Sequence, residues 1–245
     1  MTTPSSSTPL PDSWQIPAAI RGRVGREAGS QRAIFEEGHL LLILHEPPAP
    51  DMIQRIPAFF WRQPSGEWKT HRTTMPCGTL GDFLANYEKL ILELETLENT
   101  ASAAATFHGI LEVAAPLLRA IRQFHRAIQH ARDFVKDDRE LINYRDRAAG
   151  LERTGELLLQ DAQFGLNYIV ARQAEAQAEN ARRMTATAHR LNILAALFLP
   201  LTAVASVLAM DVKSRIPDTF ENFWLIVGGS FGLGLLIAFA IRKKG

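Results

Sequence analysis

The sequence has 245 residues, of which 47% are hydrophobic and 22% charged, and its 27 basic residues balance 26 acidic ones to a formal net charge of +1. This balance excludes a strongly basic nucleic-acid-binding protein and a protein with an acidic tail. The single cysteine, Cys77, excludes an intramolecular disulfide and a thiolate metal cluster within one chain.

Residues 1–30 begin with a stretch rich in Ser, Thr and Pro that contains no apolar run. Such a composition buries too little surface to order itself. The segment also lacks the basic start and apolar core of a signal peptide. We therefore expect a disordered, cytoplasmic N-terminal segment.

Residues 31–136 have the pattern of a small α/β domain. Short β-like pieces between residues 32 and 73, with a turn signal at 63–66, predict a sheet of three or four strands. Apolar residues then recur every three or four positions, which predicts helices over 80–98 and 103–135. Pro116 predicts a kink or break in the second helix.

Residues 137–190 predict one long stalk helix, because an apolar stripe runs through them with almost no helix breaker. From 171 to 190 the helix becomes rich in Ala and polar residues. This composition is typical of a helix that packs against copies of itself or lines a wet cavity.

Two uncharged runs, 191–210 and 223–241, are each long enough to cross a hydrocarbon core of about 30 Å. A pair of buried core helices is the rival interpretation. Basic residues precede the first run and form the tail 242–245, whereas the loop 211–222 carries the acidic residues Asp211, Asp218 and Glu221. The positive-inside rule then predicts a multi-pass protein of the cell membrane with both termini in the cytoplasm.

One side of the first span is small or polar along its length. The positions are Asn192, Ala195, Leu199, Thr202, Ser206 and Ala209. A helix surrounded by lipid alone would be apolar on all sides. The two helices of one chain also cannot enclose a pore. The sequence therefore predicts a homo-oligomer.

Residues 180–211, the outer-loop triplet Ile216-Pro217-Asp218 and the closing basic residues together resemble the CorA family of divalent-cation channels. The resemblance implies a mainly α membrane protein with a small α/β N-terminal cytoplasmic domain. A long stalk helix would run into the first of two C-terminal transmembrane helices, which would line the pore of a CorA-like homopentamer.

The family has Gly-Met-Asn at the outer mouth of the pore, where this sequence has Ala209-Met210-Asp211, so only Met210 matches. In a pentamer Asp211 would place a ring of carboxylates at the mouth, which suits the entrance of a cation channel. The rival interpretation is an acidic end of the span at the interface. Asp218 would concentrate cations outside the mouth, or is a solvated loop charge.

Thr202 matches the polar pore position of the family, and back-bonding to its own helix is the alternative. Asn192 would lie in the lower pore, or would form a hydrogen bond between helices. Leu199 belongs to a set of apolar residues that could gate by dewetting. That set consists of Leu191, Leu194, Phe198 and Leu199.

Gating in the family responds to cytoplasmic metal held between subunits. Candidate ligands are the carboxylates of Asp137, Asp138 and Glu140, together with Glu93, Glu95 and Glu98 on the preceding helix. Solvated helix charges are the alternative. The seven histidines show no clustered ligand spacing, and nothing in the sequence predicts an enzyme or a tightly bound cofactor.

The predicted function is a homo-oligomeric channel or transporter for divalent cations, driven by the membrane potential. Mg²⁺ is the expected ion, with Co²⁺, Ni²⁺ and Zn²⁺ as alternatives. The expected partners are further copies of the chain, the lipid bilayer and the cation, but no nucleic acid. The alternative function is a non-conducting membrane scaffold that binds a partner through its cytoplasmic domain.

Overall fold

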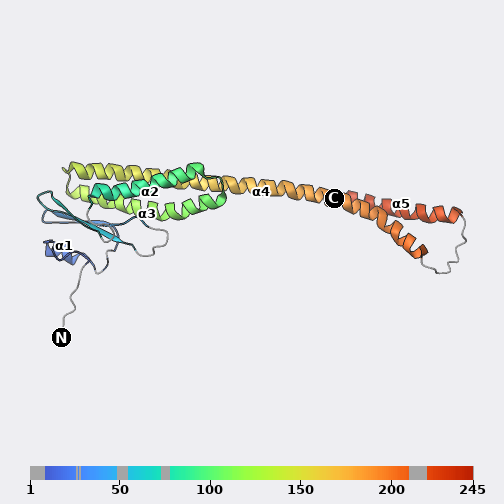
Figure 1. The fold of residues 1–245 in the computed structure, drawn as a ribbon, viewed down its shortest axis with the longest axis horizontal. Coiled ribbons are helices and arrows are strands. Elements are labelled where there is room, and N and C mark those ends of the chain that lie inside the picture. The colour runs from blue at the N-terminus through green and yellow to red at the C-terminus, as the bar shows by residue number, and fades with distance from the viewer. Residues whose placement is uncertain are drawn as a thin grey trace, which may run out of the picture. The chain divides into compact units, whose positions relative to one another are not determined.

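The computed structural model describes residues 9–25, 27, 29–48, 55–72, 78–209 and 220–244. The chain divides into two compact units, Met1–Val170 and Ala171–Gly245. The described strands are β1 Arg32–Glu36, β2 His39–His45, β3 Pro57–Arg62 and β4 Trp68–Arg72. The described helices are α1 Ala18–Gly22, α2 Leu80–Thr100, α3 Ala104–Phe134, α4 Arg139–Ala209 and α5 Phe220–Lys244 (Figure 1).

The strands form an antiparallel sheet in the order β1-β2-β3-β4, which confirms the predicted small sheet. In its register Leu42 lies opposite Ala33 on one side and Phe60 on the other. Two residues, Glu37 and Gly38, connect β1 to β2, and both have positive φ, at 50° and 78°. This backbone conformation matches the twist of a tight hairpin and explains the glycine.

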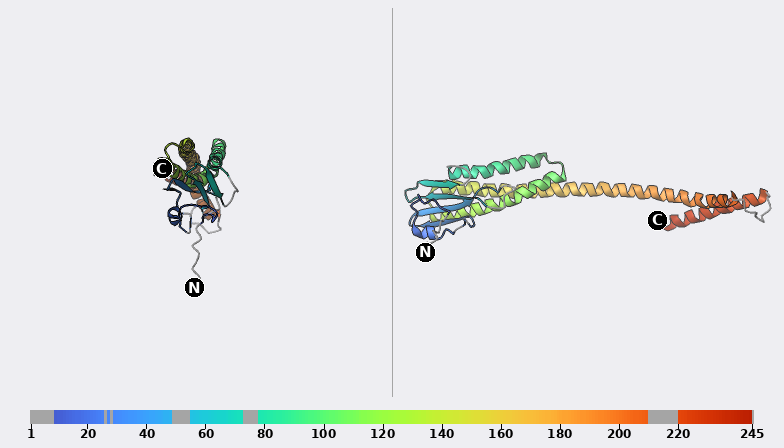
Figure 2. Two further views of the ribbon diagram at one scale, coloured as in Figure 1. Left: turned by 90° about the vertical axis from the view of Figure 1, so that its left-hand side faces the viewer. Right: turned by 60° about the horizontal axis from the view of Figure 1, so that its bottom comes forward.

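The helical face of the sheet forms the main core of the first unit. Alternate β2 residues, Leu40, Leu42 and Leu44, are fully buried and pack with Phe60 in the cluster formed by α2, α3 and the start of α4. The helix α3 packs directly against β1 and β2, and α2 packs against α3. Figures 1 and 2 show this unit as layers, with the helices on one face of the sheet.

The opposite face of the sheet is covered by the N-terminal segment, on the side where α1 lies (Figure 2). Five apolar residues of this segment pack against the outward-facing residues of the sheet. They are Leu10, Trp14, Ile16, Ile20 and Val24. The expectation of a disordered segment over 1–30 is therefore wrong for this part. Its apolar residues are too sparse to form their own core, but Leu41, Ile43 and Phe59 supply the partner surface.

The boundaries of α2 and α3 agree closely with the sequence pattern. A capping box starts α2: the Asp82 backbone N–H donates to Thr79 Oγ1, and the Thr79 backbone N–H donates to Asp82 Oδ2. The expected break at Pro116 does not occur, because α3 runs through it without ending. Pro116 lies on the exposed side of α3, where water can satisfy the carbonyl that a proline leaves free.

The start of α4 belongs to the core of the first unit rather than to a separate stalk. Its residues Leu141, Ala148, Leu151, Leu158 and Ala162 are buried in the main core. The first unit accordingly extends to Val170, whereas we expected it to end at 136. From 171 to 188 every residue of α4 is exposed, so only this later part has the character expected of a stalk.

We expect the stability of the first unit to fall as the pH drops below about 6.5. His45 is 3% exposed, and its Nε2 lies 2.8 Å from the Gly29 carbonyl oxygen. Burial lowers the pKa of His45. The positive charges of Arg55 and Arg32 lower this pKa further, whereas the hydrogen bond to Gly29 raises it. The unfolded chain therefore takes up a proton first, so stability is complete above the unfolded pKa and declines below it.

Thermal unfolding of the full chain in detergent between about pH 5 and pH 8 tests this expectation. One titrating group can change the free energy of unfolding by at most about 1.4 kcal/mol per pH unit. The variant His45→Gln should flatten the acid side of the profile. The control His130→Gln, at an exposed position on α3, should leave it unchanged. Equal acid sensitivity in the wild type and His45→Gln would show that His45 is not the group responsible.

Candidate functional site

The candidate pore residues lie on the second unit's part of α4. The helix continues from Asn192 to Ala209 without a break, with Pro200 inside it. Asn192, Leu199, Thr202 and Ser206 are all exposed in the single chain. At 100° per residue, these four positions fall within an arc of about 80° around the helix axis. The structure thus keeps the predicted small or polar side on one face of a continuous helix.

Thr202 bonds back to its own helix. Its hydroxyl oxygen lies 3.0 Å from the carbonyl oxygens of both Phe198 and Leu199, to which it can donate its one proton. These contacts stabilise the turn that contains Pro200, which has no N–H to donate. The single chain thus shows the back-bonding of Thr202, and its place in a pore stays a prediction. The hydroxyl lone pairs remain available to accept a hydrogen bond from another group.

Three predicted site residues, Met210, Asp211 and Asp218, lie outside the described residues, as does Cys77. Ala209 is the last residue of α4. The predicted ring of carboxylates and the predicted outer-loop charge therefore stay predictions from the sequence.

Two helices in the described part of the chain are long and apolar enough to cross a membrane. One is α3, which the sheet and the other helices of the first unit partly bury. The other is the stretch Arg139–Ser206 of α4, whose apolar window has no buried residue. In α5 the described apolar portion Val227–Leu236 is shorter.

The second unit exposes many large apolar side chains. On α4 these include Leu191, Leu194, Phe198 and Leu199, and on α5 they include Trp224, Leu225, Leu236 and Phe239. Soluble monomers rarely expose a contiguous apolar surface of this kind. These helices therefore differ from the surface of a typical soluble monomer.

The candidate regulatory carboxylates lie at the N-terminus of α4 in the first unit. Asp138 accepts hydrogen bonds at Oδ1 from the backbone N–H groups of Glu140 and Leu141, at 3.0 and 3.2 Å. Its Oδ2 accepts from Arg62 Nε at 2.8 Å. Asp138 is thus the N-cap of α4 and ties the helix to the end of β3, a role that the sequence could not reveal because Arg62 is 76 residues away.

The other candidate carboxylates do not gather with Asp138. Asp137 is exposed, and Glu93 forms an exposed i,i+4 pair with Lys89. In the described part of the single chain, no three His, Cys, Asp or Glu side chains are placed to hold a metal ion. The regulatory metal site, which would lie between subunits, stays a prediction.

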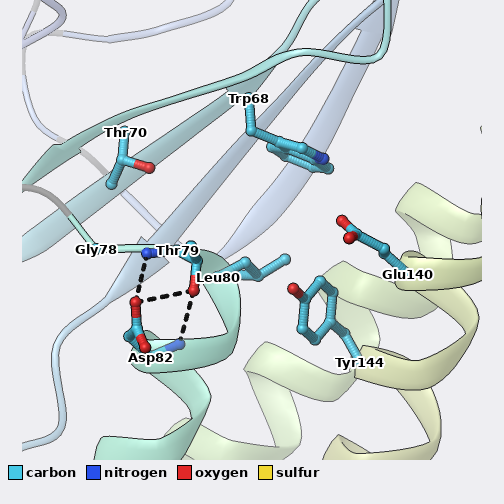
Figure 3. A pocket seen from close by; sticks show the side chains of 8 residues that line it. All are labelled: Trp68, Thr70, Gly78, Thr79, Leu80, Asp82, Glu140 and Tyr144. Carbon is cyan, nitrogen blue, oxygen red and sulfur yellow. Dashed lines mark hydrogen bonds between the residues drawn. The ribbon is translucent and has the colours of Figure 1, made fainter.

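Glu140 instead faces a pocket of about 510 Å³ between β4, the start of α2 and the start of α4 (Figure 3). Its lining residues are Trp68, Thr70, Gly78, Thr79, Leu80, Asp82, Glu140 and Tyr144. The sequence pattern marked Glu140 as a candidate ligand. It held no signal that Trp68 and Tyr144, which are 76 positions apart, would form walls of one pocket.

The family model described as "CorA-like Mg2+ transporter protein" matches residues 79–243, which is more than half of the chain. The protein belongs to this CorA-like family. The matched region begins at the N-cap of α2 and includes α3, α4 and almost all of α5. Membership confirms the resemblance drawn from the sequence and makes the chain a membrane protein. No curated protein matches the chain.

Two solved structures share the fold of this chain over most of its length. The full-length CmaX protein aligns over 88% of this chain and 78% of its own, with 16% identity and a TM-score of 0.52. The cytoplasmic domain of ZntB from Vibrio parahaemolyticus aligns over 66% and 80%, with 10% identity and a TM-score of 0.53. The CorA magnesium transporter from Methanocaldococcus jannaschii aligns over 89% and 80%, but its 13% identity and TM-score of 0.37 do not establish a common fold.

Proposed function

We propose that the protein is a homo-oligomeric channel or transporter that carries divalent cations across the cell membrane. The observation that carries this proposal is the exposed apolar stretch of α4, with Asn192, Thr202 and Ser206 on one side. This stretch lies inside the family match. Around a common axis, copies of such a helix would present a polar side to water and an apolar side to lipid.

The membrane potential is the proposed driving force. It acts on a divalent ion with about 4.6 kcal/mol per 100 mV, twice the roughly 2.3 kcal/mol for one elementary charge. Inward flow therefore needs no ATP. We propose Mg²⁺ as the ion, with Co²⁺, Ni²⁺ and Zn²⁺ as alternatives. Oxygen ligands at Asp211 and Thr202 suit Mg²⁺, which gives up its water reluctantly.

The charge pattern supports the proposed topology. Arg182, Arg183 and Arg190 precede the first span, and Arg242, Lys243 and Lys244 follow the second. Both termini would then lie in the cytoplasm. The five-fold assembly of a CorA-like pentamer is proposed on family grounds, and the exposed apolar side chains of α4 and α5 support self-association.

Uptake of divalent cations into proteoliposomes tests the proposal. With the interior held negative, we expect the wild type to take up Mg²⁺. The variant Asp211→Ala should lower the initial rate several-fold, because it removes the negative charge from the mouth. The variant Asp211→Asn, which restores the residue of the family signature, should retain more of the rate.

The charge-matched control Asp161→Asn changes an exposed carboxylate of α4 in the first unit and should leave uptake unchanged. Parallel assays with Co²⁺, Ni²⁺ and Zn²⁺ identify the ion. An absence of flux for every divalent cation would overturn the channel and favour the non-conducting scaffold. Chemical cross-linking in mild detergent tests the oligomer separately, because a chain that remains monomeric could form neither a pore nor a bundle of stalks.

A further inference from the structure

The pocket in front of Glu140 is independent of the proposed cation pathway, because all its lining residues belong to the first unit. Trp68 and Thr70 come from β4, Thr79 and Asp82 come from the start of α2, and Tyr144 comes from α4. Its volume of about 510 Å³ lies in the range of sites that bind small organic molecules.

Two aromatic rings form walls of the pocket. Trp68 and Tyr144 are partly buried and pack against the main core, which fixes their positions. Figure 3 shows the carboxylate of Glu140 directed toward the space beside these two rings. An aromatic face attracts a cation through its quadrupole, and a carboxylate attracts it through its charge. The two aromatic rings and the carboxylate of Glu140 therefore all favour a cationic ligand.

The local charges are also favourable to a cation. Asp82 adds a second carboxylate, and none of the described lining residues is basic. Three of the arginines nearby are held by other carboxylates: Arg72 by Glu46, Arg62 by Asp138 and Arg147 by Glu88. The pKa of Tyr144 is raised, mainly by burial and next by the charge of Glu140, with Asp82 and Asp138 adding to the effect and Arg147 opposing it.

A bare metal ion fits this lining less well than an organic cation. Mg²⁺ requires a near-octahedral set of oxygen ligands, whereas Trp68 offers none. Asp82 Oδ2 already accepts from the backbone N–H and the hydroxyl of Thr79, at 2.8 and 2.9 Å. An organic ammonium group needs only hydrogen-bond acceptors and aromatic faces, and its apolar body can lie against the indole ring.

We propose that this pocket binds an organic ammonium cation that carries an apolar body. The ammonium group lies against Glu140 and the ring of Tyr144, and the apolar body packs on Trp68. The ligand class follows from the aromatic walls, the two carboxylates and the pairing of every nearby arginine named above.

Calorimetric titration of the purified full chain in an uncharged detergent tests this proposal, with empty micelles as the blank. The probe is 2-phenylethylammonium, and its neutral counterpart is 2-phenylethanol. We expect saturable binding of the cation and binding of the alcohol that is weaker by about tenfold, or about 1.4 kcal/mol. Glu140→Gln and Tyr144→Phe separate the contribution of the charge from that of the hydroxyl.

Glu140→Gln should weaken binding of the cation about fivefold or more, whereas Tyr144→Phe keeps the aromatic face and should bind within about twofold of the wild type. The control Asp161→Asn should match the wild type. Equal affinity for the ammonium and the alcohol, or an affinity unchanged in Glu140→Gln, would overturn the proposal. So would a titration in which Mg²⁺ alone binds in a Glu140-dependent manner and the ammonium does not.

Discussion

The variant Arg72→Met should destabilise the first unit by about 3–5 kcal/mol, the largest effect that we expect from a single substitution. Arg72 Nε and Nη2 donate to the two carboxylate oxygens of Glu46, each at 2.8 Å. The side chains are only 2% and 9% exposed, and the guanidinium carbon lies 5.2 Å from the centre of the Phe83 ring. Methionine fills much of the same volume but leaves Glu46 as a buried, unpaired carboxylate.

Urea unfolding of the full chain in detergent, followed by circular dichroism, measures this effect. The double variant Arg72→Met/Glu46→Leu should recover most of the loss, because it removes both charges together. The control Arg147→Met breaks a pair with Glu88 whose side chains are 41% and 39% exposed, so it should cost less than about 1 kcal/mol. A loss for Arg72→Met no larger than that of Arg147→Met would contradict the interpretation.

The variant Gly165→Ala should destabilise the first unit by about 1–3 kcal/mol, although alanine is the better helix former. A Cβ atom at Gly165 would lie 2.3 Å from Phe107 Cε1 and 2.5 Å from Phe107 Cζ. Phe107 is buried in the main core and cannot move without disturbing its neighbours. The missing side chain at Gly165 therefore makes room for the ring of Phe107 between α3 and α4.

The matched control is Gly150→Ala on the same helix, where an added Cβ meets no atom within 4 Å. This change should stabilise the protein by up to about 1 kcal/mol, so the two identical substitutions should have opposite signs. Adding Phe107→Leu to the Gly165→Ala variant should recover part of the lost stability, because the smaller side chain makes room for the Cβ atom at position 165. A stabilising Gly165→Ala would show that the ring of Phe107 is free to move.

Local patterns predicted most of the secondary structure. The spacing of apolar residues predicted α2 and α3, and the turn residues at 63–66 predicted the hairpin between β3 and β4. These features depend on residues within a few positions of each other, so the sequence displays them directly. The family also follows from a local pattern, because the residues that resemble CorA are concentrated near the C-terminus of the chain.

Contacts between distant parts of the chain depended on the tertiary structure. The segment containing Trp14 and Ile20 is ordered because it packs against the face of the sheet opposite the helices. The few apolar residues of this segment do not predict that contact from the sequence. Asp138 is an N-cap paired with Arg62 rather than a free ligand, and Trp68 meets Tyr144 across one pocket. Side chains separated by tens of residues are brought together only by packing, which no local periodicity encodes.

By itself, the sequence determined the helices α2 to α5, the sheet, the long uncharged stretch of α4 and the family. Each of these follows from composition or from spacing along the chain. The tertiary structure alone decided that the first 32 residues of α4 belong to the first unit, which extends to Val170, and that Gly165 must lack a side chain. Both depend on how α4 packs against the rest of the first unit, in particular against Phe107 of α3 at Gly165.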